Sequence, residues 1–347
     1  MPERSSPDVM LSDPARHPAV QSWRRVCPTT REPNFVEVLQ DVKKGASRSY
    51  IYRLAGVGRE GTAVIAKKCT ARHAHVEQII YQEILHHLPI SSLIFYGCVD
   101  EPATDFSWLF LEDAGDDEFA YSVEEHRKLA ARWLGEMHVS AARIPAASGL
   151  PDRGPQHYLD HLCLTRQMIQ RGLGNSALTA HDLEVLEAVL SQGHFLESRW
   201  DRIEELYHRF PQTLVHCDFA SYNLRVRRGE KGISLMAFDW EMAGRGVPAP
   251  DIAELSRRGV PRRRATGDFE DSELVAYWSI VREAWPGLDL SAMKELAELG
   301  AVFRSLAAIS WESESIGHGW WPIKEFHGYQ VDLAVALEHL GLISPTR

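Results

Sequence analysis

The 347-residue sequence lacks an excess of positive charge, a long apolar run and an apolar leader. Asp and Glu number 48 against 38 Lys and Arg, and this net charge of −10 argues against a protein dedicated to nucleic acid. No stretch approaches about 18 uninterrupted apolar residues, so we expect no membrane span. The first eighteen residues contain no apolar core, which argues against a signal peptide and favours a cytoplasmic protein.

Cysteine is scarce and is not arranged in a recognisable motif. The five cysteines are odd in number, and no two of them have C-x-x-C spacing. Neither a zinc site nor a disulfide framework is therefore expected, and reduced cytoplasmic thiols are the plain interpretation. These residues are Cys27, Cys69, Cys98, Cys163 and Cys217.

Two kinds of region follow one another along the chain. Up to about residue 115, short β-rich runs separated by glycine turns surround one helical pattern, in the order β-β-β-α-β-β. Beyond it the pattern is mainly helical, interrupted by strands between residues 213 and 239. We expect an N-terminal extension with a loose lead-in over residues 1–33, a small α+β lobe over 34–115 and a larger lobe over 116–347.

Local patterns predict the individual elements. The small lobe should contain strands FVEVL, SYIYRL, TAVIAKK, LIFYGCV and SWLFLED, and one helix, HAHVEQIIYQEILHHL. In the larger lobe, Ser122 and Glu125 match a capping box that opens a helix ending near Arg143. Further helices are predicted over residues 156–171 and 180–208. Asp251 is expected to cap another helix, with bracing of the metal loop as the alternative.

The strongest chemical signal is a set of three side chains at predicted strand ends. Asn223 follows Asp218 by five positions in HCDFASYN, and Asp239 follows Asn223 by sixteen, at the end of an apolar strand. In phosphoryl transfer, one carboxylate receives the hydroxyl proton, and oxygen ligands hold Mg²⁺ on a nucleotide. We therefore predict Asp218 as the catalytic base and Asn223 and Asp239 as metal ligands. Glu241, two residues on, is either a further group facing the same metal or a surface glutamate, and His216 is expected to support the loop.

A lysine at the end of a predicted strand is the expected partner of the nucleotide phosphates. Alternation places Lys67 and Lys68 on opposite faces, so only one of them can face the nucleotide. Lys67 is preferred because it directly follows an apolar run. Glu77 or Glu83, on the next helix, is expected to pair with this lysine.

Two further segments are predicted to contact the nucleotide. Gly45 and Ser47 lie in the turn between the first two strands, where backbone N–H groups would cover phosphates. Glu112 and Asp113 end the fifth strand at the boundary between the lobes, where the backbone would hydrogen-bond an adenine.

With these residues in place, the chain resembles the aminoglycoside phosphotransferase and choline kinase family. The matching segments are KKGASRSYIYRL, VIAKK, VEQIIYQEILHHL, WLFLEDAGD, KLAARWLGEMH, HCDFASYN and FDWEMAGRGVPAPDIAEL. The resemblance implies an α+β, protein-kinase-like fold, with a small antiparallel-sheet lobe carrying one helix and a larger helical lobe. It also implies ATP or GTP with Mg²⁺ as cofactors and a small-molecule hydroxyl as acceptor. It favours Glu77 over Glu83, because Tyr81 follows Glu77 by four positions.

The chain departs from the family pattern H-G-D-L-H-P-G-N within the catalytic loop. Cys217, Phe219, Ala220, Ser221 and Tyr222 replace the residues between the fixed positions. Asp239-Trp-Glu and the lack of an A-P-E segment argue against a protein substrate. An aminoglycoside-type antibiotic is one expected acceptor; an amino alcohol or sugar metabolite, or a catalytically silent binding module, are the alternatives. The sequence indicates no oligomeric state.

Overall fold

The computed structural model describes residues 14–29, 31–40, 49–101, 103–230, 232–256 and 272–343. Its contacts divide the chain into two compact units, which are described one at a time. The first unit comprises Met1–His87, Ser91–Glu118 and Leu224–Glu241, and the second comprises Leu88–Ile90, Phe119–Asn223 and Met242–Arg347.

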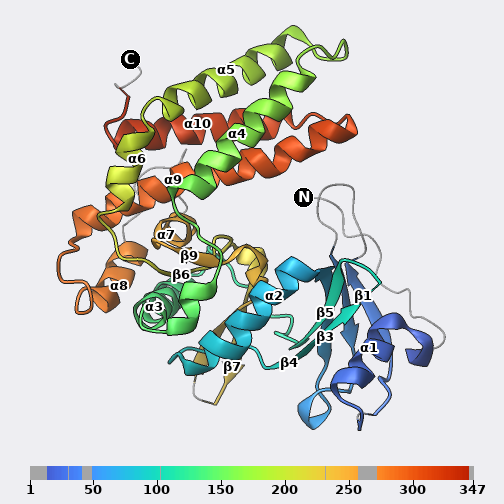
Figure 1. The fold of residues 1–347 in the computed structure, drawn as a ribbon. Helices are drawn as coiled ribbons and strands as arrows, with labels where there is room; N and C mark the ends of the chain where they lie inside the picture. Colours follow the sequence, from blue (N-terminus) through green and yellow to red (C-terminus); the bar gives the residue numbers. More distant parts are fainter. Residues whose placement is uncertain are drawn as a thin grey trace. The chain divides into compact units, whose positions relative to one another are not determined.

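The first unit is built on a five-stranded antiparallel sheet in the order β1-β2-β3-β5-β4 (Figure 1). All five predicted strands are present within two or three residues of their expected ends, because β-branched and aromatic runs between glycine turns are strong strand signals. The α+β class is confirmed. The strands are β1 (Val36–Gln40), β2 (Tyr50–Leu54), β3 (Val64–Thr70), β4 (Phe95–Glu101) and β5 (Phe106–Glu112).

One helix covers each face of this sheet. Alternate residues of β3 and β5 point to opposite faces, so Ala66 and Phe110 pack with Trp23 of α1, whereas Cys69 and Leu109 pack with α2. Helix α1 (Pro18–Val26) was missed in the sequence, where this stretch was assigned to an extension. The expected second helix is α2 (Ala71–Ile79), which continues as a π-helical turn (Ile80–Ile84) and a 3₁₀ turn (Leu85–His87).

A β-hairpin from later in the chain also groups with the first unit. Strands β7 (Leu224–Gly229) and β8 (Gly232–Ala237) pair with each other. The Val226 N–H donates to the Asp117 carbonyl at 3.0 Å, and Ser91 Oγ donates to the Leu235 carbonyl at 2.5 Å. The hairpin delivers the segment that follows β8 to the first unit.

The second unit is mainly helical, as expected. Helix α9 lies among α4, α7 and α10 (Figure 1), and one face of it is buried throughout. A short strand pair, β6 (Thr213–Val215) and β9 (Gly244–Gly246), accompanies the helices. The helices are α3 (Glu124–Ala141), α4 (Pro155–Gly172), α5 (Ala180–Glu197), α6 (Trp200–Tyr207), α7 (Ala249–Leu255), α8 (Ser272–Val281), α9 (Leu290–Ser313) and α10 (Ile323–His339).

A glycine allows α7 and α9 to approach closely. A Cβ atom on Gly300 would lie 1.9 Å from the Ala249 carbonyl oxygen, so any other residue would push the two helices apart. Because α7 and α9 each supply charged residues to the loop after β6, this contact sets the spacing of that site.

Three local predictions were wrong. Val123, not Ser122, precedes α3, and its side chain makes no capping bond. Asp251 lies inside α7 and is fully buried, because its carboxylate binds the loop after β6 instead of a helix end. The helix predicted over 180–208 is broken at Ser198 and Arg199.

Among the helices that the structure describes, none is both long and apolar enough to cross a membrane.

Candidate active site

Lys67 is the centre of a charged cluster in the first unit. Its Nζ atom lies 2.6 Å from Glu77 Oε1, 2.5 Å from Asp239 Oδ1 and 2.9 Å from Glu241 Oε2. Burial disfavours the charge on this ammonium group, but the three carboxylates outweigh burial and hold the pKa of Lys67 well above its usual value. Lys67 is therefore a fully charged cation inside the unit.

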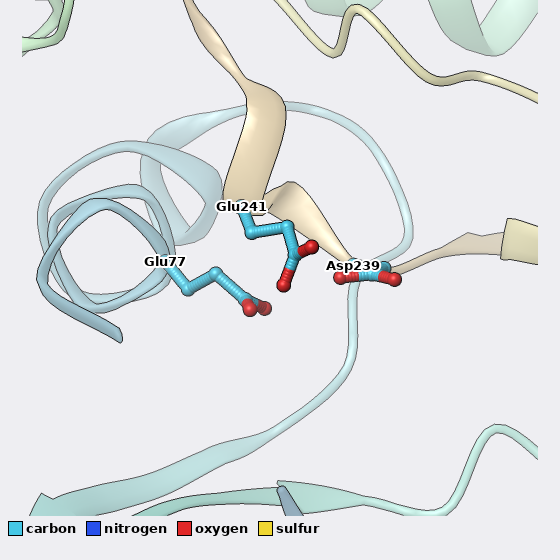
Figure 2. A group of neighbouring side chains, drawn as sticks. All are labelled: Glu77, Asp239 and Glu241. Atoms are coloured by element: carbon cyan, nitrogen blue, oxygen red, sulfur yellow. The ribbon is translucent and has the colours of Figure 1, made fainter. Parts of the chain in front are cut away.

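Local structure explains how these groups meet. Glu77 projects from α2 and is fully buried, and its burial raises its pKa to about 7 although Lys67 opposes this shift. Asp239 has a φ of 66°, a left-handed conformation that turns the chain after β8. The 3₁₀ turn Trp240–Met242 then brings Glu241 beside it. Figure 2 shows the three carboxylates converging from the helix and from this turn.

The cluster fits a hard divalent cation. Oxygen atoms of Glu77, Asp239 and Glu241 all lie within 4.8 Å of one another. Three carboxylates against one ammonium leave a formal charge of −3 + 1 = −2 in this group. Carboxylate oxygens are preferred ligands of Mg²⁺, so the donor set and the surplus negative charge both suit this ion.

The alternatives to the Lys67–Glu77 pair lie elsewhere. Lys68 points to the opposite face, where its Nζ lies 2.7 Å from Glu101 Oε2 and near the Trp108 ring. Glu83 is exposed in the π-helical turn. Alternation along β3 therefore places the two lysines as the sequence predicts, and the structure pairs Lys67 with Glu77.

Asp218 and Asn223 lie together in the second unit, in the loop after β6. Asn223 Nδ2 donates to Asp218 Oδ2 at 2.9 Å and to the Asp218 carbonyl at 3.0 Å. These two bonds fix the carboxamide and orient the carboxylate. The nitrogen of Asn223 thus faces Asp218, and the carboxamide oxygen, the atom suited to a metal, points away from it.

A buried hydrogen-bond network centred on Asp251 holds this loop in place. Asp251 accepts the backbone N–H groups of His216 and Cys217, each at 2.8 Å, and its Oδ2 lies 3.2 Å from His138 Nε2. The other ring nitrogen of His138 lies 2.9 Å from the Tyr277 hydroxyl. Asp251 therefore ties the loop to α3, α7 and α8. His216 Nδ1 in turn accepts the Asp218 N–H at 3.3 Å, so His216 also supports this loop.

Arg304 is a member of this site that no sequence motif indicated. From α9, its Nη2 lies 3.1 Å from Asp218 Oδ1 and 2.7 Å from Glu254 Oε1, and its Nη1 donates to the Cys217 carbonyl. Both carboxylates raise its pKa, and they prevail over the opposing effect of burial. The available signal was a single cation in the otherwise uncharged helix segment GAVFRSLAAIS.

Tyr222 contributes a third donor to the same carboxylate. Its hydroxyl lies 2.8 Å from Asp218 Oδ1 and 3.0 Å from Oδ2. The side chain of Tyr222 is otherwise exposed. Sequence reasoning noted this residue only as a departure from the family pattern.

The residues predicted to bind the nucleotide base and to cover its phosphates are not part of the Lys67 cluster. Glu112 pairs with Arg227 at 2.9 Å, and Asp113 pairs with Arg53 at 2.6 Å. The backbone N–H groups of Glu112 and Asp113 donate within the unit, to the carbonyls of residues 94 and 63. Their contact with an adenine stays a prediction. Gly45 and Ser47 lie outside the described residues.

Comparisons with known proteins give a consistent result. The sequence profile of the phosphotransferase enzyme family matches residues 39–291, which is more than half of the chain. A search of curated proteins found no match.

Solved structures with this fold include kinases of several small molecules. An ethanolamine kinase of Plasmodium vivax has a TM-score of 0.58 at 14% identity, over 86% of this chain and 82% of that chain. A microcompartment-associated aminopropanol kinase has a TM-score of 0.58 at 14% identity, over 90% and 93%. A spectinomycin phosphotransferase in complex with ADP and spectinomycin has a TM-score of 0.52 at 12% identity, over 91% and 98%. The expected protein-kinase-like fold is confirmed.

Proposed function

Because the chain belongs to the phosphotransferase enzyme family, we propose that it transfers the γ-phosphoryl group of ATP or GTP to a hydroxyl of a small molecule. The observation that carries this proposal is the Lys67 cluster, in which one buried ammonium is joined to Glu77 and Asp239. A strand lysine paired with a helix glutamate and placed beside a metal-binding aspartate is the arrangement that phosphoryl transfer by kinases requires.

The residues of the Lys67 cluster, together with Asn223 of the second unit, have proposed tasks in holding the nucleotide. Lys67 binds the α and β phosphates, and Glu77 keeps its ammonium in place. Asp239 and Asn223 are the proposed Mg²⁺ ligands, and Glu241 is well placed beside Asp239 to be another. When bound, Mg²⁺ neutralises phosphate charge and aligns the γ-phosphoryl group.

The backbone is proposed to hold the rest of the nucleotide. Gly45 and Ser47 would cover the phosphates with their N–H groups. The strand end at Glu112 and Asp113 would contact the base.

Asp218 is proposed to handle the acceptor. It accepts a hydrogen bond from the acceptor hydroxyl and takes its proton as the new O–P bond forms and the bond to the nucleoside diphosphate breaks. Because the transition state is loose, orientation of this hydroxyl matters more than the basicity of the carboxylate. Asn223 and Arg304 supply that orientation by holding both oxygens of Asp218.

We propose that the acceptor is a cationic polyol or amino alcohol, with an aminoglycoside-type antibiotic first and an amino alcohol or sugar metabolite as alternatives. The group formed by Asp218, Glu254 and Arg304 carries a formal charge of −2 + 1 = −1, which favours a positively charged acceptor. The five free cysteines favour work in the reducing cytoplasm.

A product-release screen tests the function. Purified protein is incubated with MgATP or MgGTP and with ethanolamine, 1-amino-2-propanol, choline, spectinomycin or kanamycin, and released ADP or GDP is measured. Asp218→Ala should lower turnover by about 10²–10⁴-fold and leave nucleotide affinity nearly unchanged. The control is Asp160→Ala, on an exposed helix face, which should change neither turnover nor nucleotide affinity. Near-normal turnover in Asp218→Ala would contradict the assignment, and a failure to bind either nucleotide would favour a silent binding module.

A further inference from the structure

The carboxylate of Asp218 is surrounded by donors of two kinds. Asn223 is a buried side chain of the second unit, and the side chain of Arg304 is only 11% exposed. Tyr222 is different, because 62% of it is exposed while its hydroxyl reaches both oxygens of Asp218. Of these three donors, Tyr222 is therefore the one whose side chain is mostly exposed.

The bond of Tyr222 has the same chemistry as the bond that an acceptor needs. An acceptor hydroxyl must donate its proton to an oxygen of Asp218 before phosphoryl transfer. Arg304 already binds Oδ1 at 3.1 Å, and Asn223 binds Oδ2 at 2.9 Å. The phenolic O–H lies within hydrogen-bond distance of both oxygens, so it competes with an acceptor hydroxyl for the same carboxylate.

The phenol is held there as a donor. Its hydroxyl lies 2.8 Å from Asp218 Oδ1 and 3.0 Å from Oδ2. An ionised carboxylate only accepts hydrogen bonds, so the phenol is the donor.

We propose that the Tyr222 hydroxyl holds the place of the acceptor hydroxyl on Asp218, so that an acceptor must displace it before transfer. This inference rests on the proposed function. The displacement selects among hydroxyl compounds. A water molecule has no other groups that bind the protein, so nothing offsets the loss of the Tyr222 hydrogen bond. An acceptor is also bound through its other substituents, and that binding energy offsets the loss. Tyr222 thus protects the nucleotide from hydrolysis and sets the minimum affinity of an acceptor.

The test uses water as the acceptor, so that no substrate needs to be known. Full-length wild type and Tyr222→Phe are incubated with saturating MgATP or MgGTP alone, and nucleoside diphosphate release is measured. Phe retains the ring and removes the hydroxyl, leaving room for water at Asp218. We expect acceptor-free hydrolysis to rise about tenfold, which corresponds to about 1.4 kcal/mol for one hydrogen bond to a carboxylate. For any acceptor found in the screen, KM should fall by a similar factor, with little change in kcat.

Two controls separate this effect from others. Tyr96→Phe removes a hydroxyl that accepts the Arg59 N–H in the first unit and should leave hydrolysis unchanged. Combining Tyr222→Phe with Asp218→Asn should abolish the gain, because the extra water acts through Asp218. Equal or lower hydrolysis in Tyr222→Phe than in an active wild type would overturn the inference alone. An absence of nucleotide binding in both proteins would overturn the proposed function, and the inference with it.

Discussion

The Lys67 site of the first unit and the Asp218 site of the second are opposite in design. In the first, one cation is surrounded by three carboxylates. In the second, one carboxylate is surrounded by the donors Asn223, Arg304 and Tyr222. The first site has surplus negative charge and gains from a bound cation. The second carboxylate already accepts three donors, and we propose that an acceptor hydroxyl replaces one of them, Tyr222.

The two sites share one backbone feature. Asp239 and Cys217 are both left-handed without being glycine, with φ values of 66° and 63°. Aspartate tolerates this conformation, because its short polar side chain forms local hydrogen bonds, whereas cysteine has no such compensation. Strain at Cys217 is sustained by Asp251 and Arg304, which bind the N–H of Cys217 and its carbonyl.

The largest effect should come from breaking the first site. Asp239→Ala removes a proposed metal ligand, and we expect the Mg²⁺-dependent affinity for ATP or GTP to fall about 100-fold, in the range of a lost buried charge contact. Isothermal titration calorimetry with and without Mg²⁺ measures this change. Asp105→Ala, at an exposed turn of the same unit, is the matched control. An unchanged Mg²⁺ dependence would remove Asp239 from the nucleotide site.

Breaking the second site should affect kcat without affecting nucleotide affinity. Arg304→Met removes the donor to Asp218 Oδ1 and leaves Glu254 unpaired, and we expect kcat to fall about 30-fold. Arg304→Lys should recover part of the loss. Millimolar guanidinium should partly restore activity to Arg304→Ala, which a general folding defect would not permit. The control is Arg209→Met, at an exposed pair with Glu295; a loss confined to nucleotide KM would contradict this role.

The shared backbone feature gives a smaller effect, on stability. Cys217→Gly and Cys217→Ala both remove the thiol, but only glycine adopts a φ of 63° without strain. We expect the Gly variant to exceed the Ala variant in free energy of unfolding by about 1 kcal/mol. Urea denaturation of both variants measures the difference. If Ala is as stable as Gly, the loop is not strained at this position.

The smallest effect is the contribution of His161 to the pH dependence of stability. His161 lies beside Trp311, whose ring also contacts Arg304. Burial, assisted by the positive charge of Arg153, lowers the pKa of His161 to about 4. The unfolded chain, with a histidine pKa near 6.5, therefore binds more protons below pH 6.5.

The contribution of His161 to stability is present above pH 6.5 and is lost as the pH falls toward 4. Urea denaturation at pH 7 and pH 5 should show a smaller decrease in His161→Gln than in wild type. His181→Gln, at an exposed position, should behave like wild type. Equal decreases in wild type and His161→Gln would show that His161 is protonated equally in both states.

Much of the fold was predictable because its signals are local. The five strands of the sheet, the strands between residues 213 and 239 and the opposite faces of Lys67 and Lys68 follow from runs and alternation within a few residues. Helix α1 was missed because its apolar face is short, with Ala19, Val20 and Trp23 as its buried apolar residues. Asp251 was misassigned because a buried acid that binds backbone amides has the same local pattern as a helix cap.

By itself, the sequence determined the spacing of Asp218, Asn223 and Asp239, the proposed catalytic and metal-binding residues. Only the tertiary structure decided their partners. It paired Lys67 with Glu77 and not Glu83, and it brought Arg304 from α9 to Asp218, 86 residues earlier. The physical reason is that a buried charge must be compensated by whatever opposite charge packing brings within reach, and packing joins residues with no relation in sequence.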